Sequence, residues 1–359
     1  MMTRALFGFV TIVLLASSAC AVRVGPKTVA RDRFDYSAAL TNSMKEQMLM
    51  NIVKVRYMDL PVFMDIAQVV ATYTFEGSAY VNTPDWAGVA SGPFAGASGR
   101  WAESPTITYN PLVGEQFSRS LLAPVSPLAI FSLVQAGWPI DAVFTVGVRA
   151  INGLYATTHL VLLKRKGDTE YYRLLRMMRD LQSKEAFALR VHRSEGAESG
   201  VMFFRPRQVD EATEAEAKEV RTLLGLNPEA KEFSVVFGAI QKDDKEIAML
   251  TRSMLEILAE ASAGVEVPAS DVQEGRVLSL PDESGLEEEA KRLRLRVRSS
   301  PDKPPQQDAY AAVHYRGRWF WVDDRDIQAK RGMGFLLTLF TLAETGTTAS
   351  PPVLTISKP

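Results

Sequence analysis

Hydrophobic residues recur along residues 37–57 at the spacing of a single helix face. Leu40, Met44, Met48, Ile52 and Val55 follow one another at intervals of three or four residues, which aligns side chains on one side of an α-helix. Pro61 follows and cannot continue a helix. The pattern predicts an amphipathic helix over 37–57 with its apolar face buried.

The composition then changes to residues typical of strands. Residues 66–81 are rich in Val, Thr, Tyr and Phe, and 106–109 form a second segment of this kind. Between them, residues 82–105 contain four glycines, with Trp86 and Trp101 near the ends. We expect a long loop here. Trp86 and Trp101 are candidate binding residues that order against a partner or membrane surface; alternatively, both fold back onto the neighbouring strands.

The rest of the chain alternates between helical and strand patterns. We expect short helices over 115–123 and 127–136, and a third from Pro139 to Asn152-Gly153. Further helices are predicted over 170–183, 210–224, 244–262 and 325–344, with a hairpin over 310–322. Strands are predicted over 186–192, 201–205, 233–240, 276–280, 292–298 and 352–356.

These elements predict an α+β fold, in which mixed or antiparallel sheets are packed with helices. We expect an N-terminal α+β region over 35–155 and a C-terminal α+β region over 156–359.

The first twenty residues have the pattern of an export signal. Arg4 gives a positively charged start, the stretch from Ala5 to Ala19 is apolar or small, and Cys20 follows as the single cysteine of the chain. This combination is typical of a secretory signal peptide. The stretch is shorter than the roughly 20 apolar residues that span a membrane.

The residues ASSAC at 16–20 resemble the lipobox of bacterial lipoproteins, although Ser17 stands where leucine is commoner. The resemblance implies that 1–19 are a signal peptide, that Cys20 is lipidated, and that 20–34 tether the protein to the membrane. Ala21 stands where inner-membrane lipoproteins commonly carry Asp, which implies the outer membrane, facing the periplasm. An ordinary secretory signal with an incidental cysteine is the alternative.

Two segments of the body also resemble exported proteins of Gram-negative bacteria with no assigned activity. They are 47–63 (QMLMNIVKVRYMDLPVF) and 315–326 (YRGRWFWVDDRD). This resemblance implies export and no particular chemistry.

Composition narrows the function classes. Hydrophobic residues make up 47% of the chain and charged residues 23%, as in a globular protein, and the formal net charge is −1. The chain has no basic excess, so we expect no nucleic-acid partner. His159, His192 and His314 stand singly, without metal-ligand spacing, and the usual hydrolase motifs are missing from the sequence. We expect no metal and no cofactor.

An alternating run of arginines is the main candidate binding feature. The period of two places guanidinium groups on one face of the predicted strand and aliphatic side chains on the other. The arginines are Arg292, Arg294, Arg296 and Arg298. They are suited to phosphate, carboxylate or lipid headgroups. Alternatively they pair with the acidic run 287–289 or simply solvate an edge strand.

The segment after the predicted hairpin turn carries aromatic and acidic residues. Trp319 and Trp321 share one strand face, which indicates either a sugar-binding surface or a buried central strand. Asp323, Asp324 and Asp326 are suited to helix capping, to binding a cation or to acid–base work.

These observations predict a membrane-anchored envelope lipoprotein that acts as a non-enzymatic binding, assembly or accessory component. Its expected partners are the membrane, through the N-terminal lipid, and an envelope protein. Two alternatives are an envelope enzyme acting on peptidoglycan or lipid, and a small-molecule or lipid carrier. An enzyme requires a cleft with convergent polar groups, and a carrier requires a large apolar cavity.

Overall fold

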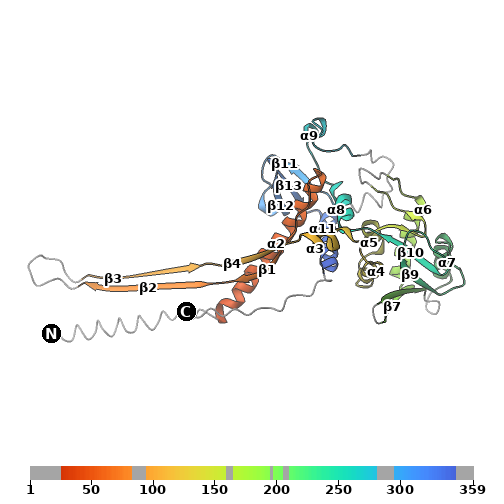
Figure 1. Cartoon of the computed structure of the whole chain (residues 1–359), viewed down its shortest axis with the longest axis horizontal. Helices are drawn as coiled ribbons and strands as arrows, with labels where there is room; N and C mark the ends of the chain where they lie inside the picture. The colour runs from red at the N-terminus through yellow and green to blue at the C-terminus, as the bar shows by residue number, and fades with distance from the viewer. Residues whose placement is uncertain are drawn as a thin grey trace, which may run out of the picture. The chain divides into compact units, whose positions relative to one another are not determined.

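The protein is an α+β structure, as the sequence predicts. The computed structural model describes residues 26–82, 94–158, 165–194, 197–204, 210–280 and 295–344 (Figure 1). Helices in these ranges accompany one sheet of mixed direction and several antiparallel strand pairs.

The described residues form two compact units. One contains residues 26–43 and 64–110, and the other contains 44–63 and 111–344. The expected boundary between 155 and 156 does not separate the units, because strands from both sides of it join one sheet of the second unit. The pairing of strands within this sheet, rather than the order of elements along the chain, therefore determines which residues belong to the second unit.

Helix α2 (Pro26–Arg56) confirms the predicted helix but begins earlier. Proline suits the first turn of a helix, where its missing N–H has no intrahelical partner. Residues 26–34 of the expected tether are therefore helical. Met48, Leu49 and Ile52 are buried, whereas Met44 is 46% exposed. The apolar stripe predicted from the spacing is thus buried only in the second part of the helix, which belongs to the second unit.

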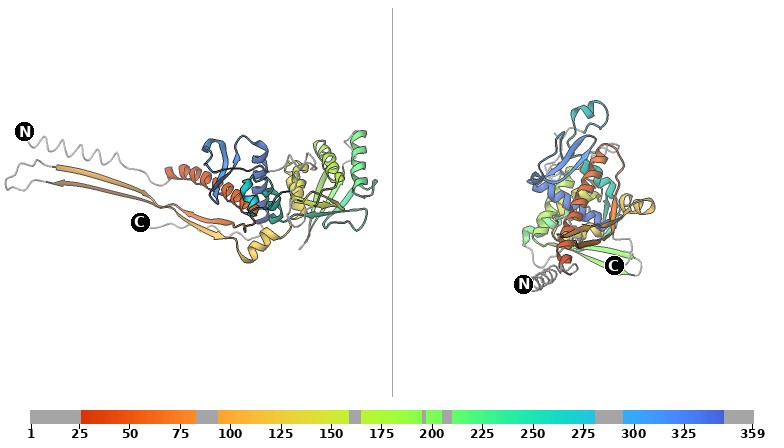
Figure 2. Two further views of the ribbon diagram at one scale, coloured as in Figure 1. Left: turned by 90° about the horizontal axis from the view of Figure 1, so that it is seen from above. Right: turned by 90° about the vertical axis from the view of Figure 1, so that its left-hand side faces the viewer.

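The first unit also contains four strands in two pairs. Strand β1 (Met64–Val70) pairs with β4 (Thr106–Pro111), and β2 (Tyr73–Asn82) pairs with β3 (Phe94–Glu103). Figure 2 shows β2 and β3 as a long ribbon of two strands. Their antiparallel register is continuous from Tyr73 opposite Glu103 to Asn82 opposite Phe94.

The prediction of a loop over 82–105 is wrong for residues 94–103, which form β3. Pairing with β2 satisfies the backbone groups of this glycine-rich segment. The ring of Tyr80 lies against Gly96, where an added Cβ would come within 2.5 Å of the Tyr80 Cζ atom. Ser78 and Ser98 share a hydrogen bond of 2.7 Å between their hydroxyl groups. Cross-strand contacts therefore make a strand of a sequence whose composition favours a loop.

The second unit is built on a six-stranded sheet with the order β6-β5-β10-β9-β8-β7. Only β9 and β10 run parallel; the other neighbours are antiparallel. The strands are β5 (Val148–Ile151), β6 (Leu154–Tyr155), β7 (Phe187–Ser194), β8 (Ala197–Phe204), β9 (Glu232–Phe237) and β10 (Glu246–Thr251).

Two predicted helices are wrong at this sheet. The helix expected up to Asn152-Gly153 ends at Gly147, and residues 148–151 form β5. The helix expected over 244–262 is replaced in its first part by β10, a central strand whose residues are almost all buried. A continuous apolar run fits either a buried helix or a buried strand, so tertiary packing decided both cases.

The second unit contains further helices in addition to its sheets. The predicted helices over 115–123, 127–136, 170–183, 210–224 and 325–344 are confirmed with small shifts of their ends. The helical elements are α3 (Gly114–Phe117), the π-turn η1 (Ser118–Leu122), α4 (Pro127–Gln135), α5 (Ile140–Gly147), α6 (Thr169–Ser183), α7 (Glu211–Leu223), α8 (Met254–Ser262), α9 (Ala269–Gln273), the short 3₁₀ helix η2 (Gln306–Asp308) and α11 (Ile327–Glu344).

A separate three-stranded sheet has the order β11-β13-β12. Its strands are β11 (Arg298–Ser300), β12 (Ala309–Tyr315) and β13 (Arg318–Asp323). The predicted hairpin is confirmed, and Arg316 and Gly317 at its turn have φ angles of 48° and 79°, as a tight two-residue hairpin turn requires. The strand expected over 276–280 is not formed. Of the strand expected over 292–298, the described residues 295–298 contribute only Arg298 to the sheet, and residues 292–294 and 352–356 lie outside the described residues.

Candidate functional site

The turn between α4 and α5 forms one wall of the candidate site. Gly137 has a φ of +96°, which lets the chain leave α4 in the left-handed region. Pro139 then precedes α5. The side chain of Gln182 on α6 holds this turn: its Nε2 donates to the Trp138 carbonyl at 2.8 Å, and its Oε1 accepts from the Ile140 N–H at 2.9 Å.

Helices α6 and α11 supply the charged side chains. The buried face of α6 includes Tyr171, Leu175 and Met178, so Arg176 and Arg179 lie on its exposed side. On α11, residues 328, 331, 332 and 335 follow one another at the spacing of one helix face. Basic residues from two helices far apart in the sequence therefore meet at this site.

These elements enclose a pocket with a volume of about 860 Å³, which we call the arginine pocket. Its size is within the range of ligand-binding pockets, roughly 300–1,000 Å³. The side chains that matter for its chemistry are those of Trp138, Asp141, Arg176, Arg179, Arg331 and Phe335. The Trp138 and Phe335 rings lie 5.2 Å apart between centroids, so the pocket combines an aromatic wall with positive charge.

The charges of the arginine pocket are only partly compensated. Arg179 Nη1 lies 2.6 Å from each carboxylate oxygen of Asp141. Arg331 is exposed, and no hydrogen bond or ion pair among the described residues involves its guanidinium. Arg331 therefore contributes a positive charge to the pocket that no described side chain pairs with. The arrangement is suited to an anionic group attached to an apolar portion.

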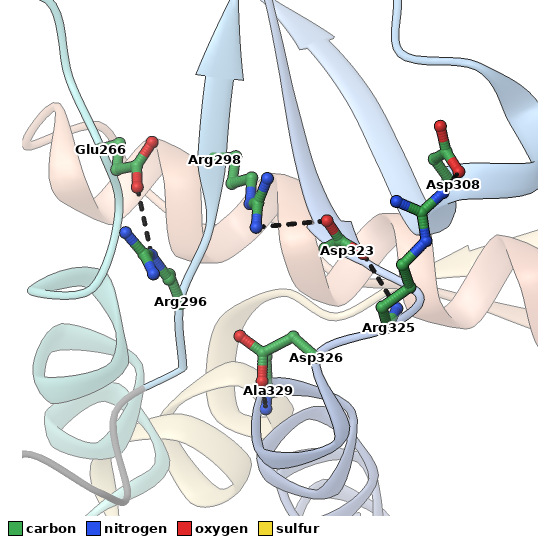
Figure 3. A network of polar contacts seen from close by, with 8 residues as sticks. All are labelled: Glu266, Arg296, Arg298, Asp308, Asp323, Arg325, Asp326 and Ala329. Carbon is green, nitrogen blue, oxygen red and sulfur yellow. Dashed lines mark hydrogen bonds and ion pairs between the residues drawn. The ribbon is translucent and has the colours of Figure 1, made fainter.

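The arginine run predicted from the sequence is paired where it is described. Arg296 Nε lies 3.3 Å from a Glu266 oxygen, and Arg298 Nη2 lies 3.3 Å from an Asp323 oxygen (Figure 3). Leu295 and Val297, which alternate with these arginines along the chain, are buried, so the alternation is confirmed here. Arg292, Arg294 and the acidic run 287–289 lie outside the described residues. The acidic partners of Arg296 and Arg298 are therefore Glu266 and Asp323, which lie outside the acidic run that the sequence suggested.

A smaller pocket of about 330 Å³ lies beside this pair. Its lining includes Arg298, Asp323, Lys303, Asp308 and Arg325. Arg325 pairs with Asp308, and the Lys303 ammonium lies 5.0 Å from the centre of the Trp319 ring. Because its cations already have partners, this pocket offers less attraction to an added anion than the arginine pocket.

The predicted acidic cluster acts in helix capping. Asp326 Oδ1 accepts a hydrogen bond of 2.9 Å from the Ala329 N–H at the start of α11 (Figure 3), and Asp324 pairs with Lys330. Phe320 and Val322 are buried, whereas Trp319 and Trp321 are half-buried. Strand β13 therefore packs Phe320 and Val322 into the core and leaves the two tryptophans partly exposed.

The two segments that resemble exported proteins meet in the second unit. Tyr57 donates a hydrogen bond of 2.7 Å to Asp271, while Asp59 accepts one from Tyr315 and pairs with Arg316. Burial raises the pKa of Tyr57 and of Tyr315, and the hydrogen bond from Tyr315 lowers the pKa of Asp59. All three pKa values move away from neutrality, so this cluster is suited to holding the fold rather than to proton transfer near pH 7.

Of the remaining predicted residues, Trp101 is in β3, where its backbone lies opposite that of Phe75. Cys20, Trp86 and His159 lie outside the described residues. His314 lies beside Trp319, with 5.2 Å between ring centroids. Within the described parts of the chain, no three His, Cys, Asp or Glu side chains are grouped to suit a metal ion. No helix in those parts has the length and apolar character that crossing a membrane requires.

Sequence reasoning missed the arginine pocket. Arg176 and Arg179 lie three residues apart on the polar side of a strongly amphipathic helix. Charged residues at this spacing are equally typical of any solvent-exposed helix face. Arg331 and Phe335 lie on a helix more than 150 positions away along the chain. Only the spacing of the two arginines within α6 was visible in the sequence, and it does not distinguish a site from an ordinary surface.

Comparison of the chain with protein-family models, curated proteins and solved structures finds no match.

Proposed function

We propose that the protein is a lipid-anchored component of a bacterial envelope that binds, without chemical change, an anionic ligand in the arginine pocket. The observation that carries the binding role is the convergence of Arg176, Arg179 and Arg331 on one pocket with an aromatic wall. The lipid anchor rests on the sequence of residues 1–20.

The chemistry of the pocket favours a particular class of ligand. Guanidinium groups form paired hydrogen bonds with phosphate or carboxylate oxygens. The Trp138 and Phe335 side chains favour an apolar or ring-shaped portion of the same molecule. An anionic lipid headgroup and a soluble phosphate ester share this chemistry.

Calorimetric titration of the purified protein tests the binding role and separates the two sources. The probes are dihexanoylphosphatidylglycerol, its zwitterionic counterpart dihexanoylphosphatidylcholine, and inorganic phosphate. We expect the anionic lipid to bind more tightly than the zwitterionic one. Heat from inorganic phosphate that matches the anionic lipid would instead indicate a site for soluble phosphate compounds.

Arg331→Gln should weaken binding about tenfold or more, because a hydrogen bond to a charged group contributes about 1.5–3 kcal/mol. Arg173→Gln is the control: Arg173 lies on α6, like Arg176 and Arg179, but it pairs with Glu219 and does not line the pocket. Equal affinities for the parent and Arg331→Gln would contradict the proposed binding site.

Anchoring has its own test. Mass spectrometry of the mature N-terminus should find Cys20 as the first residue, carrying acyl chains. Cys20→Ala should release the protein from the membrane fraction, because the acyl chains that supply the membrane affinity are attached to this residue. A free Cys20 thiol, or a mature chain that starts elsewhere, would contradict the anchor and leave the pocket proposal standing.

A further inference from the structure

The β2–β3 ribbon leaves a long strand edge open on each side. The two strands form a sheet of their own, so each has one edge with no neighbouring strand among the described residues. Ten residue pairs follow one another without a bulge. At the base of the ribbon, Tyr73 donates a hydrogen bond to Asp32 of α2, which fixes the ribbon within its own unit.

A ribbon of only two strands has low stability in water. Two strands by themselves are only marginally stable, and a third strand is the usual remedy. Open edges are templates for pairing with another chain, and proteins commonly block them with lysine, proline or a bulge. Strands β2 and β3 contain no lysine, no proline and no break in register. With respect to the described strands, both outer edges are therefore open to an added strand.

The charges on the ribbon indicate what adds to it. Glu76 of β2 lies directly opposite Arg100 of β3, and both are exposed. When β2 of one copy lies beside β3 of the next at the same level, Glu76 of the first copy meets Arg100 of the second. The two edges of one chain are thus complementary to each other in charge and in strand direction.

We propose that a second copy of this chain adds to the ribbon, with β2 of one copy pairing antiparallel with β3 of the next. The contact is head-to-tail, because two different edges meet. Ser78 and Ser98, two positions from the charged pair, then lie next to each other across the contact as they do within the hairpin. This inference is independent of the proposed ligand and of the lipid anchor.

Charge reversal tests the contact by sedimentation of the full chain. The parent should associate, and Glu76→Arg or Arg100→Glu alone should each weaken association about tenfold, because like charges then face each other across the contact. A 1:1 mixture of the two variants should restore it, because each copy then presents the opposite charge to its neighbour. Glu232→Arg, an exposed position on β9, is the control. A monomeric parent, or single variants that associate like the parent, would overturn the proposal.

Cross-linking gives a second readout that does not depend on the stability of the ribbon after charge reversal. In a Cys20→Ala background, a chain with Ser78→Cys is mixed with a chain with Ser98→Cys and oxidised. The mixture should give a disulfide-linked dimer in high yield, and either chain alone should give much less. Equal yields from the mixture and the single chains would overturn the proposed register.

Discussion

Gln182 fastens the wall of the arginine pocket, so replacing it tests how that wall is held. Its amide makes three hydrogen bonds to the last turn of α4 and the connection to α5: Nε2 donates to the carbonyls of Trp138 at 2.8 Å and Val134 at 3.3 Å, and Oε1 accepts from the Ile140 N–H at 2.9 Å. Gln182→Leu keeps a similar volume and removes all three hydrogen bonds.

The expected cost follows from the burial of these partners. Ile140 is fully buried, and its N–H begins α5, where no intrahelical acceptor exists. An unpaired buried N–H costs about 1–3 kcal/mol, and each lost hydrogen bond to a carbonyl costs about 0.5–1.5 kcal/mol. Burial of the apolar leucine side chain offsets about 1 kcal/mol of this loss in stability. We expect a net loss of about 3 kcal/mol in the free energy of unfolding.

Urea unfolding followed by fluorescence measures this loss through the midpoint and slope. Gln273→Leu is the matched control, since Gln273 is exposed on α9 and outside the pocket; it should change stability by less than about 0.5 kcal/mol. Ligand binding by Gln182→Leu should also weaken, because Trp138 loses its fixed position. If Gln182→Leu unfolds at the same urea concentration as the parent, the turn is held by something other than this amide.

Three further predictions concern the core and one surface cluster. Met48→Asp should destabilise the protein by several kcal/mol, because Met48 is 1% exposed and an unpaired carboxylate is costly to bury, whereas Met44→Asp at a position 46% exposed should melt close to the parent. Gly264→Ala should lower the melting temperature, since its Cβ would lie 1.9 Å from a backbone oxygen, and Gly334→Ala in an open part of α11 should raise it; the reverse order would contradict the geometry. The pKa of Asp59 is depressed in the folded protein. Its carboxylate therefore stabilises the fold at pH values above the unfolded pKa of about 3.9, and this stabilisation is lost as the pH falls through the folded pKa. The stability gap between the parent and Asp59→Asn should therefore be widest near neutral pH and close in acid; a gap independent of pH would refute the role of the charge.

Local patterns in the sequence determined much of the second unit. The spacing of apolar residues over 170–183 and 210–224 predicted α6 and α7 to within a residue at each end. The two-residue turn at Arg316-Gly317 predicted the β12–β13 hairpin. These features depend on residues that are neighbours along the chain, so periodicity and turn chemistry suffice to specify them.

Other features of the fold and of the site were determined only by the tertiary structure. The segment 246–251 is apolar enough for a helix or a strand, and its place between β5 and β9 makes it a strand. The glycine-rich residues 94–103 form β3 because β2 supplies partners for their backbone groups. The arginine pocket exists because packing brings Arg176 and Arg179 of α6 to Arg331 of α11. Nothing local distinguishes these arginines from solvated ones, since their role depends on side chains far away in the sequence that only the folded chain places beside them.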